Sequence, residues 1–309
     1  FRSPTSIQEL ESTKAGRKGL IHRLKNFRSS TPYRIILRYP ILPVGIIIML
    51  ILMAAFANVI SPKDPLDSDL AHVKSPPAWL EGGTTEYFFG ADQIGRDLMS
   101  RIFHGARISL MVAGIVLGAG GSIGIVLGII AGYSGGFRDE LIMRMVDMAF
   151  AIPFILVALV AAVVFGASLG LVLILLSMFS WPPFARQTRG LTLQLKEMDY
   201  VAAARVAGAS PLRIAVRHIA PGLSNIVIVL ATLQVGGLIL TESVLSFLGI
   251  GIPAPKPAWG SMVADGREFI STAWWISVMP GLAIFLVVFA FNFLGDWLRD
   301  HFDPRLRQL

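Results

Sequence analysis

The feature that most constrains the fold is the run from residue 148 to 185, which contains no charged side chain. A single helix of that length would measure about 57 Å, whereas one crossing of a bilayer needs only about 20 residues. We therefore divide the run at 166–170, which gives one span over about 146–165 and another over about 169–185. Pro153 lies inside the first of these spans and is expected to kink it.

Four further apolar segments predict an all-α, polytopic membrane protein with six transmembrane helices. They cover residues 41–60, 108–132, 225–248 and 276–295. The composition agrees, because 54% of the residues are hydrophobic and 15% are charged, whereas an average soluble domain is about 25% charged. The chain has no cysteine, which excludes a disulfide framework and a thiolate metal site.

The spans also divide the chain into segments. The expected parts are a basic cytoplasmic N-terminal tail (1–40), a first transmembrane helix (41–60), an extracytoplasmic segment (61–107), a five-helix core (108–296) with a polar cytoplasmic loop (186–224), and a cytoplasmic C-terminal tail (297–309). Within the first tail, residues 20–39 are expected to form an interfacial helix. Twenty of the 27 Lys and Arg residues fall in segments that would be cytoplasmic if the N-terminus is inside. This bias predicts that both termini are cytoplasmic.

A glycine repeat marks the second span. The glycines recur every four residues and therefore share one helix face: Gly120, Gly124, Gly128 and Gly132. Small residues in this register let another helix approach closely in lipid. We interpret the stripe as a helix-packing surface rather than as a chance cluster.

Three residues are candidates for the translocation path or for the interior of the bundle: Asp147, Pro153 and Glu242. An acid at membrane depth is costly unless it faces protein or water. Asp147 lies at the edge of its span, where it could reach the interface, pair with Arg144 or face the path, and we favour a structural role. Glu242 lies inside the fifth span and is expected to face the bundle or the pore.

The polar stretch 199–221 predicts two short helices. Gly208 is expected to end the first helix with a positive φ angle, and Ser210 and Pro211 have the residue types that begin the second. On the second helix one face is expected to hold the apolar residues Leu212, Ala215, Val216 and Ile219, and another to hold Arg213 and Arg217. The pattern suits either a docking surface or a connecting loop on the membrane.

This stretch resembles the EAA loop of ABC-importer permeases, and specifically that of the C-type permease subunit of dipeptide, oligopeptide and nickel importers. Three other segments resemble the same family: the run Phe89–Asp97 (G-A-D-x-x-G-R-D), the E-x-x-L-S-F-L-G motif that begins at Glu242, and the ending 296–305. Three positions depart from the family pattern, namely Ala91, Ala202 and Ala220. The departure at Ala202 removes an acidic residue that the family often places there.

The resemblance implies a type I ABC-importer permease fold in the bacterial inner membrane. It implies a heterodimer with a second homologous permease, two cytoplasmic ATPases that bind ATP and Mg, an extracytoplasmic substrate-binding protein and contact with membrane lipid, but no nucleic acid. The cargo would be di- or oligopeptides, with nickel chelates or other small solutes as the alternative. The loop would couple to the ATPase through Ala202, Ala203, Ala204, Arg205, Gly208, Ala209, Ser210, Pro211, Arg213 and Arg217.

Motifs of other classes are not found. The chain contains no G-x-x-x-x-G-K-[ST], so we expect no ATPase site or cofactor of its own and no enzymatic activity. An ion-coupled secondary transporter using Asp147 and Glu242 is a second interpretation, but it would require more intramembrane acids and an internal repeat. A membrane-anchored helix-turn-helix regulator is a third, but the three-helix core that it needs is missing.

Overall fold

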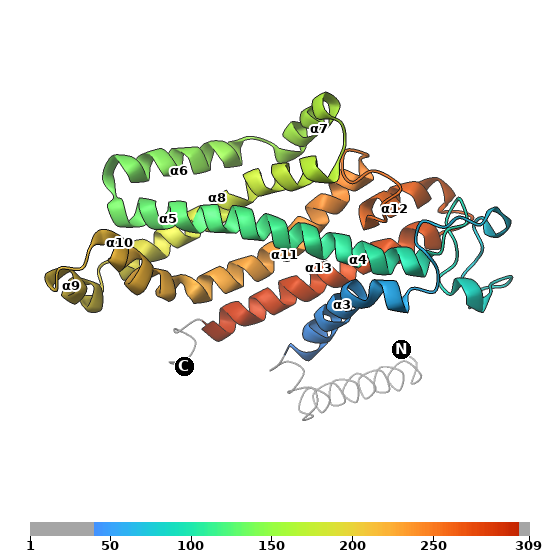
Figure 1. Cartoon of the computed structure of the whole chain (residues 1–309), viewed down its shortest axis with the longest axis horizontal. Coiled ribbons are helices and arrows are strands. Elements are labelled where there is room, and N and C mark those ends of the chain that lie inside the picture. The colour runs from blue at the N-terminus through green and yellow to red at the C-terminus, as the bar shows by residue number, and fades with distance from the viewer. Residues whose placement is uncertain (1–39, 303–309) are drawn as a thin grey trace, which may run out of the picture.

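The computed structural model describes residues 40–302, so the expectations for the N-terminal tail (1–39) and for residues 303–309 lie outside the described part. Within residues 40–302 the chain forms helices and turns, with one isolated bridge between Ala91 and Asp97 and no strand. The all-α prediction is confirmed. Figure 1 shows an elongated bundle with loops at both ends.

Within residues 40–302, five helical stretches are long and apolar enough to cross a membrane. They are α3 (Ile41–Ile60), the continuous run Leu98–Ser134, α8 (Leu169–Leu195), the run Pro211–Phe247 that contains α11 (Ser224–Phe247), and α13 (Trp275–Phe302). Two shorter helices, α6 (Gly136–Ala151) and α7 (Phe154–Phe165), are bent by 76° and make a sixth span if they are counted together. The expected kink is confirmed at Pro153, which precedes α7 with an extended ψ of 108°.

Three helices continue beyond the predicted limits of their spans. The second span begins at Leu98 instead of 108, because Asp97 caps α4 (Leu98–Val116) by accepting from the Ser100 N–H at 2.8 Å. The non-helical segment before α4 therefore ends at Asp97. Likewise α8 continues to Leu195, so the polar loop is shorter than 186–224, and α13 continues to Phe302 through the start of the expected tail at 297. Charged residues mark the ends of the apolar runs and not the ends of these helices, because a helix tolerates charge outside the apolar layer.

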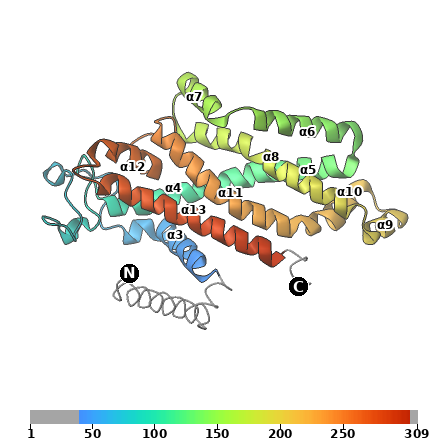
Figure 2. The same cartoon turned by 180° about the vertical axis from the view of Figure 1, so that it is seen from behind.

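A π turn, η3 (Leu117–Gly121), joins α4 to α5 (Ser122–Ser134) without interrupting the helix. Figures 1 and 2 show α5 running beside α8. The glycine stripe faces this neighbour: an added Cβ would lie 1.8 Å from Ser180 Oγ at Gly120, 2.3 Å from Trp181 O at Gly124, 1.9 Å from Thr188 Oγ1 at Gly128, and 2.7 Å from Thr192 Cβ at Gly132. The four-residue register is thus the contact line between the two helices.

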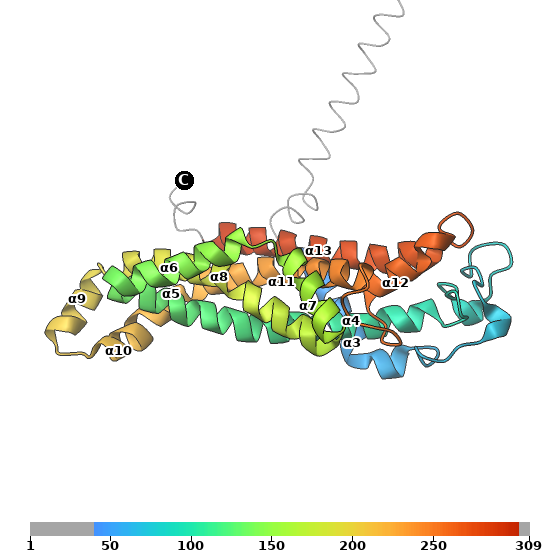
Figure 3. The same ribbon diagram turned by 90° about the horizontal axis from the view of Figure 1, so that it is seen from above.

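The main apolar core lies where α3, α4 and α13 meet α12 (Trp259–Gly266). Trp259 is fully buried there and its indole N–H donates to the Ile102 carbonyl at 3.0 Å. The segment before α4, which is predicted to be the outer segment, carries two short turns, η1 (Leu70–His72) and η2 (Thr85–Tyr87), and α12 continues into η6 (Arg267–Phe269). Figure 3 shows these segments gathered at the end of the bundle opposite α9 (Asp199–Val206).

Candidate functional site

The polar loop forms one end of the molecule (Figure 1). It contains α9, α10 (Pro211–Ile214), the π turn η4 (Ala215–Ile219) and η5 (Ala220–Leu223). Gly208 has a φ of +78°, as the sequence predicts, and the Ala209 N–H donates to the Ala204 carbonyl at 3.0 Å. Ser210 then caps α10 by accepting from the Arg213 N–H at 3.3 Å. The signals for stopping and starting a helix are therefore confirmed.

The predicted apolar face of the second helix is wrong. Ile214 and Ile219 are buried, and they share a small core with Val201 and Leu223. Leu212 and Val216 are instead exposed, together with other residues of the loop. The reason is the π turn: five residues then make roughly one turn, so Ile214 and Ile219 lie on one face, whereas a regular helix would separate them.

This inversion leaves an apolar and basic surface at the end of the molecule, which we call the docking tip. Its apolar members are exposed to 91% (Val206), 74% (Leu212) and 62% (Val216) of their full area. The rest of the docking tip is formed by the exposed residues Arg205, Arg213 and Arg217. Side chains from α5 and α8 support it from below: Ile129, Tyr133, Leu191 and Leu195. A rigid base with exposed apolar and cationic groups suits a protein partner.

A cavity of about 460 Å³ lies at the break between α6 and α7. Pro153 lines it, as do residues of α8 and α11. Non-helical backbone is tolerated at membrane depth where it is buried in protein or lines a water-filled cavity. The cavity is therefore the part of the bundle best suited to contain a polar solute, and Pro153 is the one of the three translocation-path candidates that faces it.

Asp147 has a different role from the one that its neighbour Arg144 suggests. Arg144 pairs with Glu140 at 2.8 Å, one turn earlier on α6. Asp147 pairs with Arg186 of α8, whose guanidinium also lies 4.7 Å from the centre of the Phe150 ring. Asp147 thus links α6 to α8 through an exposed ion pair and does not line the cavity.

Glu242 faces the bundle and does not line the cavity. It is 1% exposed, and it accepts a hydrogen bond from Ser246 Oγ at 2.7 Å. Ser246 Oγ in turn accepts from the Ile252 N–H at 3.0 Å. Two residues of the E-x-x-L-S-F-L-G motif, Glu242 and Ser246, therefore form a chain of hydrogen bonds that holds the loop after α11.

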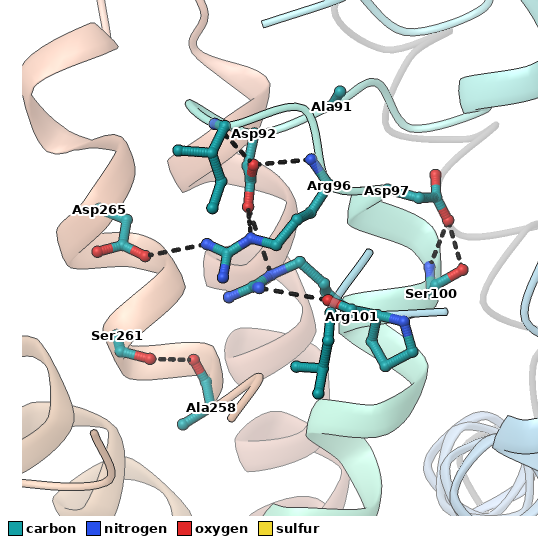
Figure 4. Close-up of polar contacts among 12 residues, drawn as sticks. Ala91, Asp92, Arg96, Asp97, Ser100, Arg101, Ala258, Ser261 and Asp265 are labelled. Atoms are coloured by element: carbon teal, nitrogen blue, oxygen red, sulfur yellow. Dashed lines mark hydrogen bonds and ion pairs between the residues drawn. The ribbon is translucent and has the colours of Figure 1, made fainter. Parts of the chain in front are cut away.

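Sequence reasoning missed a buried ion cluster at the end of the bundle opposite the docking tip (Figure 4). Asp92 accepts from the Arg96 backbone N–H at 2.9 Å and from Arg96 Nε at 2.7 Å, and Arg101 Nε lies 3.6 Å away. Arg96 also lies 3.9 Å from Asp265, and this contact joins the segment before α4 to α12. The G-A-D-x-x-G-R-D motif pointed to part of this cluster, but nothing in the sequence pointed to Asp265.

Comparison with known proteins identifies the family. Residues 124–308 match the family described as the binding-protein-dependent transport system inner membrane component. This chain belongs to that family. It is a permease subunit of an ABC importer of the bacterial inner membrane, and membership implies an ATPase and a substrate-binding protein as partners. The predicted family, general function and localisation are confirmed.

Relatives of this permease match most of its length. It is 39% identical over 267 residues to the di/tripeptide transport system permease protein DppC of Pseudomonas aeruginosa, covering 85% of this chain and 88% of the relative. It is 42% identical over 262 residues to the dipeptide transport system permease protein DppC of Escherichia coli K12, covering 85% and 87%. It is 39% identical over 264 residues to the glutathione transport system permease protein GsiD of Pectobacterium atrosepticum, covering 84% and 85%.

The permease also resembles a solved structure, an inward-facing conformation of the MetNI methionine ABC transporter, with a TM-score of 0.48 and 16% identity over 65% of this chain and 95% of the other.

Proposed function

We propose that this permease forms half of the translocation path for di- or oligopeptides, as a heterodimer with a second homologous permease. The three relatives described above are named for di/tripeptide, dipeptide and glutathione transport, and each is covered over more than four fifths of its length. The cargo shared by these names is a short peptide. Nickel chelates and other small solutes are the alternative cargo class.

A separate ATPase binds to the docking tip. The docking tip then transmits to the membrane helices the movement that ATP hydrolysis drives in the ATPase. The observation that carries this assignment is the inversion of the loop: Ile214 and Ile219 are buried, while Leu212 and Val216 face outward. An apolar pair on a fixed base can be covered by a partner, and the three arginines around it can pair with acidic groups. ATP and Mg would be bound by that ATPase, not by this chain.

The charge bias supports the orientation that this assignment needs. Twenty of the 27 Lys and Arg residues fall in the sequence segments that would be cytoplasmic if the N-terminus is inside, and the docking tip belongs to one of those segments. The cytoplasmic face would then carry the docking tip, and the opposite end, with the outer segment and α12, would receive the substrate-binding protein.

Co-purification of the whole complex tests the proposal. The permease pair, its ATPases and its binding protein are reconstituted in ATP-loaded liposomes, and the solute that co-purifies with the binding protein is identified by mass spectrometry. We expect a short peptide and its uptake at the expense of ATP. A nickel chelate as the bound solute, with no peptide uptake, would contradict the peptide assignment.

A further inference from the structure

Another cavity lies at the side of the bundle, between α3 and α13, two helices that contact one another (Figures 1 and 2). We call it the lateral cleft. Its volume is about 380 Å³, and its lining covers residues 46–53 of α3 and 279–287 of α13. Met49 and Leu282 form its mouth, because they are 48% and 47% exposed, whereas Leu50 behind them is buried. The lateral cleft therefore opens to the outside of the bundle.

The lining of the lateral cleft is apolar throughout. All thirteen residues that line it within the described part of the chain are Ile, Leu, Val, Ala, Met, Phe or Trp. Their side chains carry one N–H group, the indole N–H of Trp259, and it donates to the Ile102 carbonyl at 3.0 Å. An apolar cavity of this kind does not hold water. The lateral cleft therefore suits an apolar occupant.

The lateral cleft lies at the depth of the lipid acyl chains. The helix α3 has 20 residues, and this length of about 30 Å equals the thickness of the hydrocarbon layer. Residues 46–53 are the sixth to the thirteenth of these 20 residues. They therefore lie near the middle of the layer, and the groups outside the mouth are acyl chains rather than head groups or water.

The size of the lateral cleft suits a single hydrocarbon chain. Its lining extends over about two turns of each helix, which is about 11 Å. Two turns of a helix about 10 Å across would occupy about 850 Å³, which is more than twice the volume of the lateral cleft. A helix of a second permease is therefore too thick to enter it. Met49, Met53 and Met279 contribute flexible thioether side chains to the walls, and such side chains adapt to the shape of an occupant.

We propose that the lateral cleft binds one acyl chain of a membrane phospholipid. The chain fills the space that the side chains of α3 and α13 leave open, and it gains packing contacts with both helices. The lipid is then part of the contact between the first span and the rest of the bundle. This inference depends neither on the cargo nor on the docking tip.

A photoreactive phospholipid tests the proposal. The permease pair with its ATPases is reconstituted in liposomes that contain phosphatidylethanolamine with a diazirine in one acyl chain. The complex is then extracted in detergent and separated from exchangeable lipid by size-exclusion chromatography before irradiation. We expect mass spectrometry of the digested protein to find adducts on Met53 and Met279, which are half-buried in the walls of the lateral cleft. Phe56 is the internal control, because it is 52% exposed on α3 and does not line the lateral cleft, and it should lose its adducts with the exchangeable lipid.

Two positions on α13 provide matched substitutions. Ala283 lines the lateral cleft, whereas Val278, which is 43% exposed, does not. Ala283→Phe adds a ring inside the lateral cleft and should lower the yield of adducts about tenfold, since the methylene groups of the chain lose the surface that binds them. Val278→Phe adds a ring to the same helix outside the lateral cleft and should leave the yield near that of the wild type. Ala283→Leu fills less of the space and should lower the yield to a smaller extent, which keeps the test decisive if the Phe variant does not assemble.

Three outcomes would overturn the proposal. Equal yields on Phe56 and Met53 would show that only loosely bound lipid surrounds the protein. The absence of adducts on Met53 and Met279 would show that the lateral cleft is empty or is covered by the second permease. Equal yields in the variants of Ala283 and Val278 would place the bound chain outside the lateral cleft.

Discussion

Gly128 of α5 lies so close to Thr188 of α8 that a Cβ on the glycine would come within 1.9 Å of the threonine Oγ1. Thr188 is fully buried, and its hydroxyl donates to the Phe184 carbonyl at 2.7 Å, so it has little freedom to move aside. The Ala185 carbonyl would lie 2.6 Å from the same Cβ. The contact between α5 and α8 at position 128 therefore has room for the hydrogen atom of glycine but not for a methyl group.

Replacement of Gly128 by Ala is therefore expected to destabilise the permease by about 1–3 kcal/mol, through overpacking. Gly114 is the control, because an added Cβ there meets nothing within 4 Å. Gly114→Ala should be neutral or slightly stabilising, since Ala favours helix more than Gly does. Thermal unfolding of the detergent-solubilised complex measures both, and equal midpoints would contradict the close packing.

The buried ion cluster predicts that removal of Asp92 destabilises the permease much more than removal of the exposed Glu140. Asp92→Ala would leave Arg96 and Arg101 buried with only the more distant Asp265, and we expect a loss of about 3–5 kcal/mol. Glu140→Ala breaks an exposed pair with Arg144 and should cost less than about 1 kcal/mol. Unfolding in detergent followed by size-exclusion chromatography compares the two variants. Similar losses for both would show that the cluster is not a structural tie.

The positive φ of Gly208 predicts a defect in coupling without a defect in folding. Val at this position costs about 1–2 kcal/mol in the left-handed region, and the strain would turn the docking tip relative to its base. We expect Gly208→Val to insert in the membrane and to pair with the second permease, but to lose ATPase binding and substrate-stimulated hydrolysis.

Gly208→Asn is the matched control, because Asn adopts this conformation more readily. It should retain most of both activities. Wild-type ATPase pull-down and hydrolysis in the Val variant would refute the coupling role of the loop.

The acidic residues in the spans predict that uptake is driven by ATP and not by a proton gradient. Asp147 is paired with Arg186, and Glu242 is hydrogen-bonded within the bundle, so neither is placed to carry a proton through the cavity. Uptake into ATP-loaded vesicles should therefore survive a protonophore. Glu242→Gln should lower the amount of assembled complex without changing this behaviour. Loss of uptake on adding the protonophore would favour a secondary transporter.

The orientation is predicted from the distribution of basic residues. Reporter fusions after residues 75 and 167 should give an external signal, and a fusion after residue 200, at the start of α9, should give a cytoplasmic signal. A cytoplasmic signal at 75 or an external one at 200 would contradict the topology.

The sequence was sufficient for features that depend on nearby residues. Uncharged runs located the spans, Pro153 located the break, and Gly208 with Ser210 located the turn between α9 and α10. Each of these follows from the backbone preferences of one or two residues or from the cost of placing charge in lipid.

The remaining features depend on residues that are distant in the sequence or on an irregular turn. Asp147 pairs with Arg186 of α8 and not with its neighbour Arg144, because the fold packs α6 against α8. Arg96 lies near Asp265 because the fold packs the segment before α4 against α12. The burial of Ile219 depends on the π turn η4, and the residues of that turn do not distinguish it from a regular α-helix. The helix α4 continues past the end of its apolar run because Arg101 lies beside Asp92 in the buried ion cluster and Arg107 donates to the carbonyl of Ala54.

The uninterrupted passage from α4 through η3 to α5 has a structural consequence. This helical run covers Leu98–Ser134, 37 residues, which corresponds to about 55 Å. One end is fixed by the Asp97 cap next to the ion cluster, and the other end supplies Ile129 and Tyr133 to the base of the docking tip. The run therefore connects the buried ion cluster to the base of the docking tip by continuous helical backbone, and the π turn between Leu117 and Gly121 is where its regular hydrogen-bond pattern changes.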